Sequence, residues 1–244
     1  MRLKEHLRKI PGLLKLLRLG RIVLDPTHRS EWQLKRNKPH NLFQPDGHTF
    51  FDRYPWIFSA VKELLLEVAT PRLLSFGCST GEEVFTLRRY FPQAEILGID
   101  INPHSIALCQ KKLIQARDSH IQFKLASSPG EEVKDYYDAV FCMAVLRHGE
   151  LGFSHSENCA HLIRFEDFER TIRGFYRVLK PGGLLIIRHS NFRIADTALA
   201  EEFDVVLAII PNRLVEKTPL YGSNNQLLGN DVYNDTVFRK RNVA

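Results

Sequence analysis

A turn of small residues is the strongest candidate for chemistry in the sequence. It reads GCSTG (residues 77–81), follows the apolar run RLLSFG (72–77) and precedes a predicted helix that opens with Glu82 and Glu83. Small side chains allow a ligand to approach the backbone. Two carboxylates in the first helical turn would repel a pyrophosphate, which commonly binds a helix N-terminus. We therefore predict that a neutral or cationic part of a ligand lies here.

A carboxylate stands at the expected distance from this turn. The run EILGID (95–100) ends in Asp100, 19 residues after Gly81, and Asn102-Pro103 is predicted to cap the next helix. A carboxylate at this offset is placed to accept hydrogen bonds from a ribose diol. Together the two features predict a nucleoside ligand without phosphates, and S-adenosylmethionine is of that kind. The competing interpretation is a tight turn with a capping carboxylate.

The same turn also satisfies the pattern GxSxG, the nucleophile elbow of α/β-hydrolases. A serine hydrolase would use Ser79, with Asp138 or Asp204 and His189 as partners. The sequence has no upstream HGG-type segment, and Glu82 and Glu83 would oppose an oxyanion at that helix end. The hydrolase is therefore a remote alternative.

Alternating apolar runs and helical stretches predict the elements that position this turn. Short, mostly apolar runs stand at 72–77, 95–100, 121–127, 137–144 and 183–190. Strands that are apolar on both faces and alternate with helices are typical of a parallel sheet covered on both sides. The clearest predicted helix carries an apolar stripe and ends at LKPGG (179–183). A further helix is predicted over 55–69. The tail adds a helix (195–203), an apolar run (205–210) and a last strand (235–241). The predicted fold class is α/β: a doubly wound, mostly parallel, seven-stranded Rossmann-like sheet with N-terminal helices. The stripe of the clearest helix is Phe165, Phe168, Ile172, Phe175 and Leu179.

The basic character of the chain belongs to its first residues. Of 244 residues, 44% are hydrophobic, and the net charge of +6 is fully accounted for by residues 1–21; the remainder carries 27 basic and 27 acidic residues. Residues 1–20 have helical amphipathic spacing, and 25–52 form a polar stretch without period, predicted to be a loop or arm. We predict an N-terminal segment of helix and arm (1–52) and a second domain (53–244). A nucleic acid or membrane surface is expected as a partner only through residues 1–21.

The glycine turn and the run that ends in Asp100 lie in segments that resemble a known family. LLSFGCSTGEEVFTL (73–87) followed by ILGIDINPHSIALCQ (96–110) resembles the class I S-adenosylmethionine-dependent methyltransferases, and GCSTGEE resembles the chemotaxis receptor methyltransferases, the CheR family. HTFFDR (48–53), YDAVFCMAVL (137–146) and LKPGGLLIIRHS (179–190) resemble further segments of that family. Ala144 and Arg188 depart from it, standing where the family has Asn and Gly. The chain also lacks room for the subdomain with which that family recognises receptors.

The resemblance implies a set of cofactor-binding residues in a Rossmann-like methyltransferase domain. Asp100 would hold the ribose of S-adenosylmethionine, and Thr49 and Arg53 would meet its methionine end, where a guanidinium suits a carboxylate. Ser127 is a candidate near the adenine. The remaining candidates, from the glycine turn and the ends of the second and fourth runs, are Gly77, Cys78, Ser79, Gly81, Ile101, Cys142 and Met143.

Methyl transfer to an alcohol or phenol benefits from a general base. His148, after the fourth run, is the first candidate, and His189, at the end of the fifth, is the second. His148, His155, Cys159 and His161 match no common metal-site spacing, so no metal is predicted. The four cysteines form no CxxC pair, which predicts free, mostly buried thiols.

The sequence thus predicts an S-adenosylmethionine-dependent methyltransferase that acts on an O or N atom of a small-molecule acceptor. Glutamyl methylation of a protein, as in the CheR family, and a non-catalytic nucleic-acid-binding protein are the alternatives. No apolar run reaches the roughly 20 residues of a membrane span, and charged residues interrupt the leucines of 1–20, unlike a signal peptide. A cytoplasmic protein is therefore expected. No oligomeric state follows from the sequence.

Overall fold

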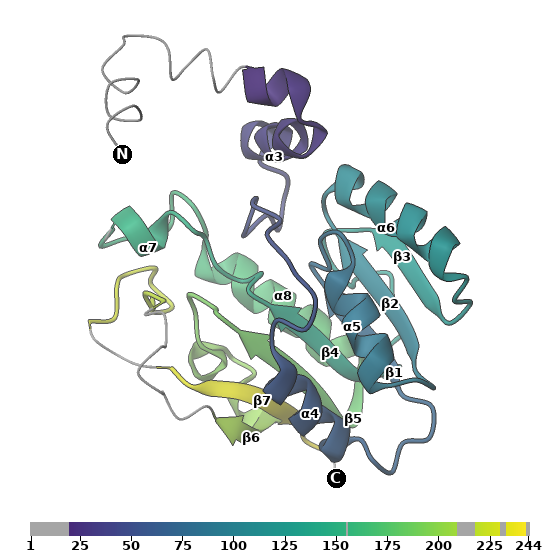
Figure 1. The fold of residues 1–244 in the computed structure, drawn as a ribbon. Helices are drawn as coiled ribbons and strands as arrows, with labels where there is room; N and C mark the ends of the chain where they lie inside the picture. Colours follow the sequence, from purple (N-terminus) through teal and green to yellow (C-terminus); the bar gives the residue numbers. More distant parts are fainter. Residues whose placement is uncertain (1–19, 155, 209–217, 230–232, 243–244) are drawn as a thin grey trace, which may run out of the picture.

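The computed structural model describes residues 20–154, 156–208, 218–229 and 233–242. They form one seven-stranded sheet in the order β3-β2-β1-β4-β5-β7-β6 (Figure 1). Strands β1 to β5 run parallel to one another, and β7 is antiparallel to both β5 and β6. This confirms the predicted doubly wound, mostly parallel sheet. The strands are β1 Arg72–Phe76, β2 Glu95–Asp100, β3 Ile121–Leu125, β4 Tyr137–Met143, β5 Leu179–Arg188, β6 Phe203–Ala208 and β7 Asp235–Lys240.

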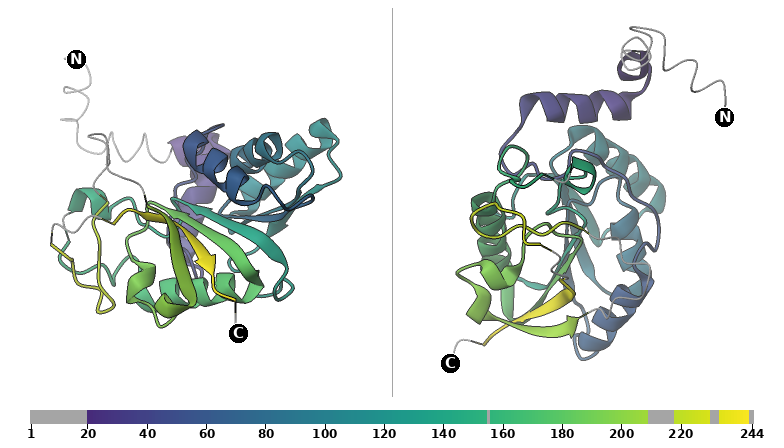
Figure 2. Two further views of the ribbon diagram at one scale, coloured as in Figure 1. Left: turned by 90° about the horizontal axis from the view of Figure 1, so that it is seen from below. Right: turned by 90° about the vertical axis from the view of Figure 1, so that its left-hand side faces the viewer.

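Helices cover both faces of the sheet. Helices α4 (Pro55–Leu64), α5 (Glu82–Tyr90) and α6 (Pro103–Ala116) lie on one face, and α8 (Phe165–Val178) lies on the other (Figure 2). Strand β4 is buried at every position. Its Val140 and Cys142 belong to the core beneath α8, whereas Phe141 and Met143 belong to the core beneath α4 to α6. The central strand therefore supplies two hydrophobic cores, which explains its uninterrupted apolar sequence.

The predicted amphipathic helix before LKPGG is α8. Its phenylalanines at 165, 168 and 175 are buried, as is Ile172. The helix ends at Val178 because Leu179 takes an extended backbone conformation and begins β5. Gly182, within β5, has a φ of +75°. Leu179, predicted as the last residue of the stripe, is instead the first residue of the strand.

The last strand, β7, lies between two strands that precede it in the chain. Its terminal residue, Lys240, is buried, and its ammonium donates to Asp135 Oδ1 (2.7 Å) and to the carbonyl oxygens of Tyr176 and Leu179. These three partners satisfy all the protons of the buried ammonium. The predicted strand 235–241 is confirmed.

The prediction that the polar stretch 25–52 is only a loop or arm is wrong, because it contains helix α3 (Pro26–Asn37). The Asp25 side chain caps this helix by accepting hydrogen bonds from the amides of Thr27 and His28. Only Ser30 and Leu34 of α3 are buried, and the Ser30 hydroxyl donates to Asn102 at the start of α6. A helix that packs through so few residues has little apolar period, and this is why the pattern did not reveal it.

Two other predicted helices are shorter than expected. Helix α4 ends at Leu64, so residues 65–69 are not helical. The helix predicted over 195–203 is replaced by two 3₁₀ turns, η1 (Ile194–Asp196) and η2 (Ala200–Glu202). Between them the Thr197 hydroxyl donates to the Ile194 carbonyl and accepts from the Leu199 amide, a local bonding pattern that competes with α-helix. The amphipathic segment 1–19 and residues 209–210 lie outside the described residues.

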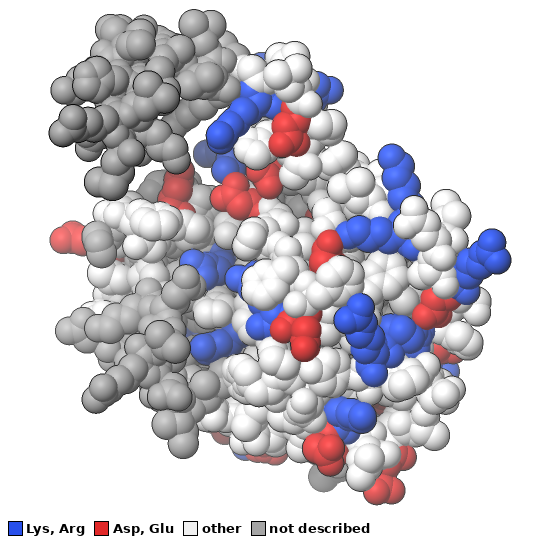
Figure 3. All heavy atoms as spheres, in the orientation of Figure 1, with Lys and Arg blue, Asp and Glu red and all other residues white. Residues whose placement is uncertain are grey.

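Acidic and basic side chains are interspersed over the described surface of the face in Figure 3. This agrees with the equal numbers of acidic and basic residues after position 21. Among the described residues, no helix is both long and apolar enough to span a membrane.

Candidate active site

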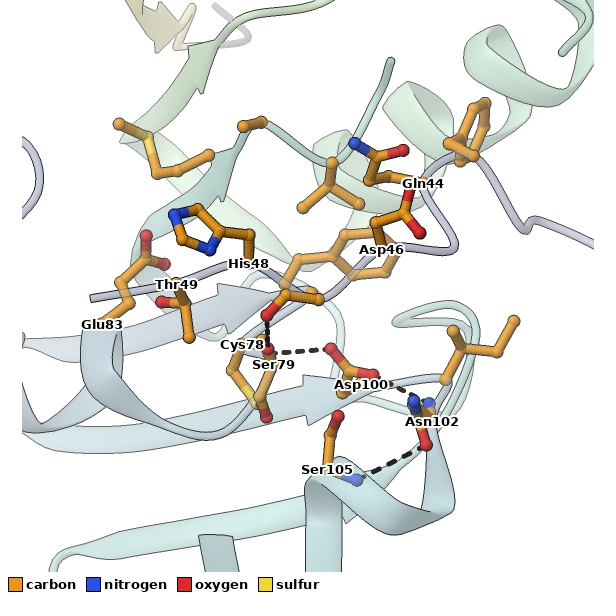
Figure 4. A pocket seen from close by; sticks show the side chains of 18 of the residues that line it. Gln44, Asp46, His48, Thr49, Cys78, Ser79, Glu83, Asp100, Asn102 and Ser105 are labelled. Atoms are coloured by element: carbon orange, nitrogen blue, oxygen red, sulfur yellow. Dashed lines mark hydrogen bonds between the residues drawn. The ribbon is translucent and has the colours of Figure 1, made fainter. Parts of the chain in front are cut away.

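A pocket lies at the carboxyl ends of β1, β2 and β4, the edge where open α/β sheets bind ligands. It encloses about 970 Å³, including its open mouth, and its outer wall is formed by residues 41–50, which come from the polar stretch between α3 and α4. Figure 4 shows side chains of this wall facing those of the glycine turn across the pocket. Nine of the eleven predicted cofactor-binding residues line it: Thr49, Arg53, Gly77, Cys78, Ser79, Asp100, Ile101, Ser127 and Met143.

The other two predicted residues do not line the pocket. Gly81 is the N-cap of α5 and packs against Cys109 and Phe123 behind the turn. The Cys142 side chain points into the core beneath α8. All four cysteines are buried free thiols, as predicted.

The glycine turn depends on the absence of a side chain at Gly77. Its φ is +72°, and a Cβ there would lie 2.4 Å from a methyl group of Val145. The amides of Gly77 and Cys78 both donate to the carbonyl of Ile99, at 2.8 and 3.0 Å, which ties the turn to the end of β2. The turn and the carboxyl end of β2 therefore form one rigid unit.

Asp100 faces the pocket from the end of β2. Its Oδ2 accepts from the Ser79 amide and its Oδ1 from the Asn102 amide, both at 2.8 Å (Figure 4). Burial raises the pKa of Asp100, and these two hydrogen bonds oppose that rise. Each carboxylate oxygen has a further lone pair. Asp100 is thus fixed in orientation and can still accept hydrogen bonds from a diol.

The two glutamates of the first α5 turn do not act as a pair of free negative charges, as the sequence had suggested. Glu82 forms an ion pair with Lys112 (2.5 Å) and accepts from the Thr80 hydroxyl; these contacts outweigh burial and lower its pKa. Glu83 lines the pocket and accepts from the Ser75 hydroxyl at 2.7 Å. Burial raises the pKa of Glu83 to about 7. Repulsion of a pyrophosphate by this turn is therefore weaker than predicted.

Sequence reasoning missed the residues that close the pocket from outside. The Ser79 hydroxyl donates to the Gly47 carbonyl (2.7 Å), and Gln44 Oε1 accepts from the Gly149 amide (3.3 Å). Asp46 pairs with Lys35 of α3 at 2.7 Å. The sequence signalled only a loop here, because these contacts reach residues far away in the chain.

His148, the first candidate base, lies in a second cavity on the other side of residues 41–45. Its Nδ1 accepts from the Glu150 amide at 3.3 Å, so the neutral ring carries its proton on Nε2. In this form His148 presents a donor rather than a base. Burial lowers its pKa.

His189, the second candidate, lies beside the pocket rather than among the residues that line it. Its ring is 5.9 Å from that of Tyr54, which does line the pocket. Its backbone has a φ of +54° at the end of β5. Burial, assisted by nearby guanidinium groups, lowers the pKa of His189 to about 3, so the imidazole is neutral at physiological pH.

The geometry does not assemble the alternative sites. Within the described ranges, Ser79 has no histidine partner, and Asp138 lies at the amino end of β4, paired with Lys180 at 2.6 Å. Asp204 of the edge strand β6 pairs with Arg241, which follows β7. No group of three potential metal ligands occurs among the described residues. His155, one of the four residues considered for a metal site, is not among them.

A family model described as a methyltransferase domain matches residues 69–233, about two thirds of the sequence. The chain belongs to this methyltransferase family. It is a class I domain of the kind that uses S-adenosylmethionine as cofactor. The resemblance to the CheR family finds no support in the comparisons.

Curated relatives match parts of the methyltransferase. A demethylmenaquinone methyltransferase of Thermus thermophilus is 30% identical over 51% of this chain and 50% of its own length. A trans-aconitate 2-methyltransferase of Deinococcus radiodurans is 24% identical over 68% of this chain and 58% of its own length. An uncharacterized protein of a Synechococcus strain is 28% identical over 59% of this chain and 31% of its own length. The chain thus spans between a third and three fifths of the length of these relatives.

Proposed function

We propose that this protein transfers the methyl group of S-adenosylmethionine to an O or N atom of a small-molecule acceptor. The observation that carries the proposal is Asp100, held by two backbone amides in a pocket at the carboxyl edge of the sheet. Two of the curated relatives are named for small organic acceptors, a demethylmenaquinone and trans-aconitate, and this supports an acceptor of similar size.

The donor set of the pocket fits the cofactor. Asp100 would accept from the ribose hydroxyls, and the turn at Gly77 would let the cofactor approach the backbone. Arg53 would hold the methionine carboxylate through its guanidinium. Arg53 Nη1 already donates to the His48 carbonyl at 3.2 Å, and its guanidinium lies 5.2 Å from the centre of the Tyr54 ring, so it is positioned before binding.

When bound, S-adenosylmethionine supplies a methyl carbon that is activated by the adjacent sulfonium. The chain's own residues then have to align the acceptor and exclude water. Residues 41–50 cover the pocket, and the Ser79–Gly47 hydrogen bond holds them in place. We propose that neutral His189 orients the acceptor by a hydrogen bond, because a base with a pKa of about 3 removes a proton poorly.

Calorimetric titration with S-adenosylhomocysteine and S-adenosylmethionine tests this function. We expect both to bind wild-type protein, and Asp100→Ala to weaken binding at least about tenfold, as expected for loss of a charge-assisted hydrogen bond. Asp204→Ala, which removes an exposed carboxylate on the edge strand β6, serves as the matched control and should bind like wild type. Failure of both compounds to bind, or unchanged binding by Asp100→Ala, would contradict the proposal.

A further inference from the structure

A second charged region lies beside the pocket, at the carboxyl ends of β4 and β5. Arg188, the last residue of β5, is in register with Met143 of β4, which lines the pocket. The Arg188 carbonyl accepts from the amide of Ala144, another lining residue, at 2.7 Å. Arg188 therefore lies immediately beside the pocket wall, on the side away from Asp100 and β2.

Several positively charged groups influence His189 and Tyr54, which lie near Arg188. The pKa of His189 is depressed first by burial and then by three guanidinium groups, and the same three groups act on Tyr54. They belong to Arg53, Arg147 and Arg188. The acidic group that faces them from α5 is Glu83, whose pKa is raised by burial to about 7. A carboxyl that is about half protonated at neutral pH supplies little negative charge to the Arg188 guanidinium, and no carboxylate of the described residues is among the groups that shift the Arg188 pKa.

Arg188 differs in its contacts from two other partly buried arginines, Arg88 and Arg177. Arg88 pairs with Asp118 at 2.6 Å, and Arg177 donates to the carbonyls of Gly130 and Glu132. The Arg188 guanidinium is half-buried, and it has no hydrogen bond or ion pair to any described residue. Burial lowers its pKa, as expected of a cation that has lost part of its hydration. Such an arrangement costs stability unless an anion compensates it.

We propose that Arg188 binds an anionic group, a carboxylate or a phosphate, on the methyl acceptor. Its fork of N–H donors matches either anion in a bidentate manner. Arg53 is assigned to the cofactor carboxylate, so Arg188 is the guanidinium left for the acceptor, and Arg147 adds positive charge on the same side. The identification of the bound anion as the acceptor rests on the proposed methyl transfer; the anion site itself does not.

Calorimetry on the full chain saturated with S-adenosylhomocysteine tests the anion site, with citrate and inorganic phosphate as probes at constant ionic strength. We expect one of the two to bind at one equivalent, and the probe that binds distinguishes a carboxylate site from a phosphate site. Arg188→Gln should weaken that binding at least about tenfold, because it removes a charge-assisted bidentate contact. Arg173→Gln, an equal change of charge on the exposed face of α8, should leave binding unchanged.

The variants also separate this inference from the proposed function. Unchanged affinity for S-adenosylhomocysteine in Arg188→Gln shows that the variant is folded. If Arg188→Gln does not fold, Arg188→Lys replaces it as the test. Arg188→Lys keeps the positive charge but lacks the paired N–H donors of the guanidinium, so it should bind the anion several-fold more weakly than wild type. Absence of binding by both anions, or equal binding by wild type and the Arg188 variant, overturns the inference. If wild type does not bind S-adenosylhomocysteine, the proposed function fails, and the same titrations on the unliganded chain then decide the anion site.

Discussion

The two ends of the pocket satisfy their polar groups in different ways. At the end formed by β1 and β2, Asp100 accepts from two backbone amides and the glycine turn is bonded to Ile99. At the end formed by β4 and β5, Arg188 has no bonded partner among the described residues and His189 is buried in its neutral form. Backbone amides hold Asp100 in place at the first end, whereas we propose that an anion on the acceptor pairs with Arg188 at the second. We infer that backbone geometry defines the cofactor end and side-chain charge defines the acceptor end.

The largest effect is expected from filling the glycine turn. Gly77→Ala places a methyl group against Val145 and forces a positive φ on alanine. We expect a loss of about 2–5 kcal/mol in the free energy of unfolding, from the left-handed backbone and overpacking combined. Urea unfolding measures it. Gly152→Ala in the short helix α7 (Leu151–Ser154), where a Cβ meets nothing within 4 Å, is the control and should not destabilise the protein. Equal effects of the two substitutions would show that the turn is not a rigid unit.

The neighbouring glutamates should give pH profiles of opposite sign. The folded pKa of Glu83 is raised from 4.5 to about 7, so the native state keeps a proton that the unfolded chain has released. Wild-type stability should therefore fall as the pH rises from about 4.5 to 7, and Glu83→Gln should remove that fall. The folded pKa of Glu82 is lowered, so Glu82 contributes stability above pH 4.5 that is lost as the pH falls through its folded pKa. Urea unfolding of wild type, Glu83→Gln and Glu82→Gln measures both, over a pH range that extends from well below pH 4 to pH 8 so that it includes the folded pKa of Glu82. Parallel profiles for the two variants would contradict the assignment.

Replacing Arg188 should stabilise the protein while it weakens anion binding. Arg188→Met removes a partly dehydrated cation, and we expect a gain of about 1 kcal/mol in the free energy of unfolding, as is common when a functional group is removed from its site. Arg88→Met, which breaks the ion pair with Asp118, should be destabilising by about 1–3 kcal/mol. Denaturant midpoints compare the two. A destabilised Arg188→Met would mean that Arg188 has a structural role.

The smallest effect is expected at the serine of the turn. Ser79→Ala removes the hydrogen bond to the Gly47 carbonyl, which should cost about 0.5–1.5 kcal/mol of stability. Binding of S-adenosylhomocysteine should persist, because the Ser79 amide still donates to Asp100. A hydrolase that used Ser79 as nucleophile would instead lose all activity, so cofactor binding by this variant separates the two enzyme classes.

The cofactor end was predictable because its chemistry is encoded locally. Gly77 needs a positive φ, Asn102 caps α6, and Asp100 ends a strand, and each of these requirements is visible within a few neighbouring residues. The mostly parallel sheet with helices on both faces followed from apolar runs that alternate with helical stretches. The predicted repulsion of a pyrophosphate by Glu82 was overestimated, because Lys112 of another helix, α6, neutralises the Glu82 carboxylate.

The acceptor end and the outer wall were not predictable in the same way. Gln44 and Gly47 contact residues 105 and 32 positions away, so no local pattern marks them. Arg188 was visible only as a departure from a family pattern, and its significance depends on the missing ion pair. Helix α3 was missed because it packs mainly through Ser30 and Leu34.

The position of β7 has a consequence for how the protein is made. Its residues leave the ribosome after β5 and β6, yet β7 lies between them and is the strand with which β6 pairs. Until residues 235–240 emerge, β5 presents an open edge and β6 has no neighbour in the sheet. The elements of the cofactor end precede this strand and can assemble during synthesis. The flank of β5 that carries Arg188 is completed only when the last strand has been inserted.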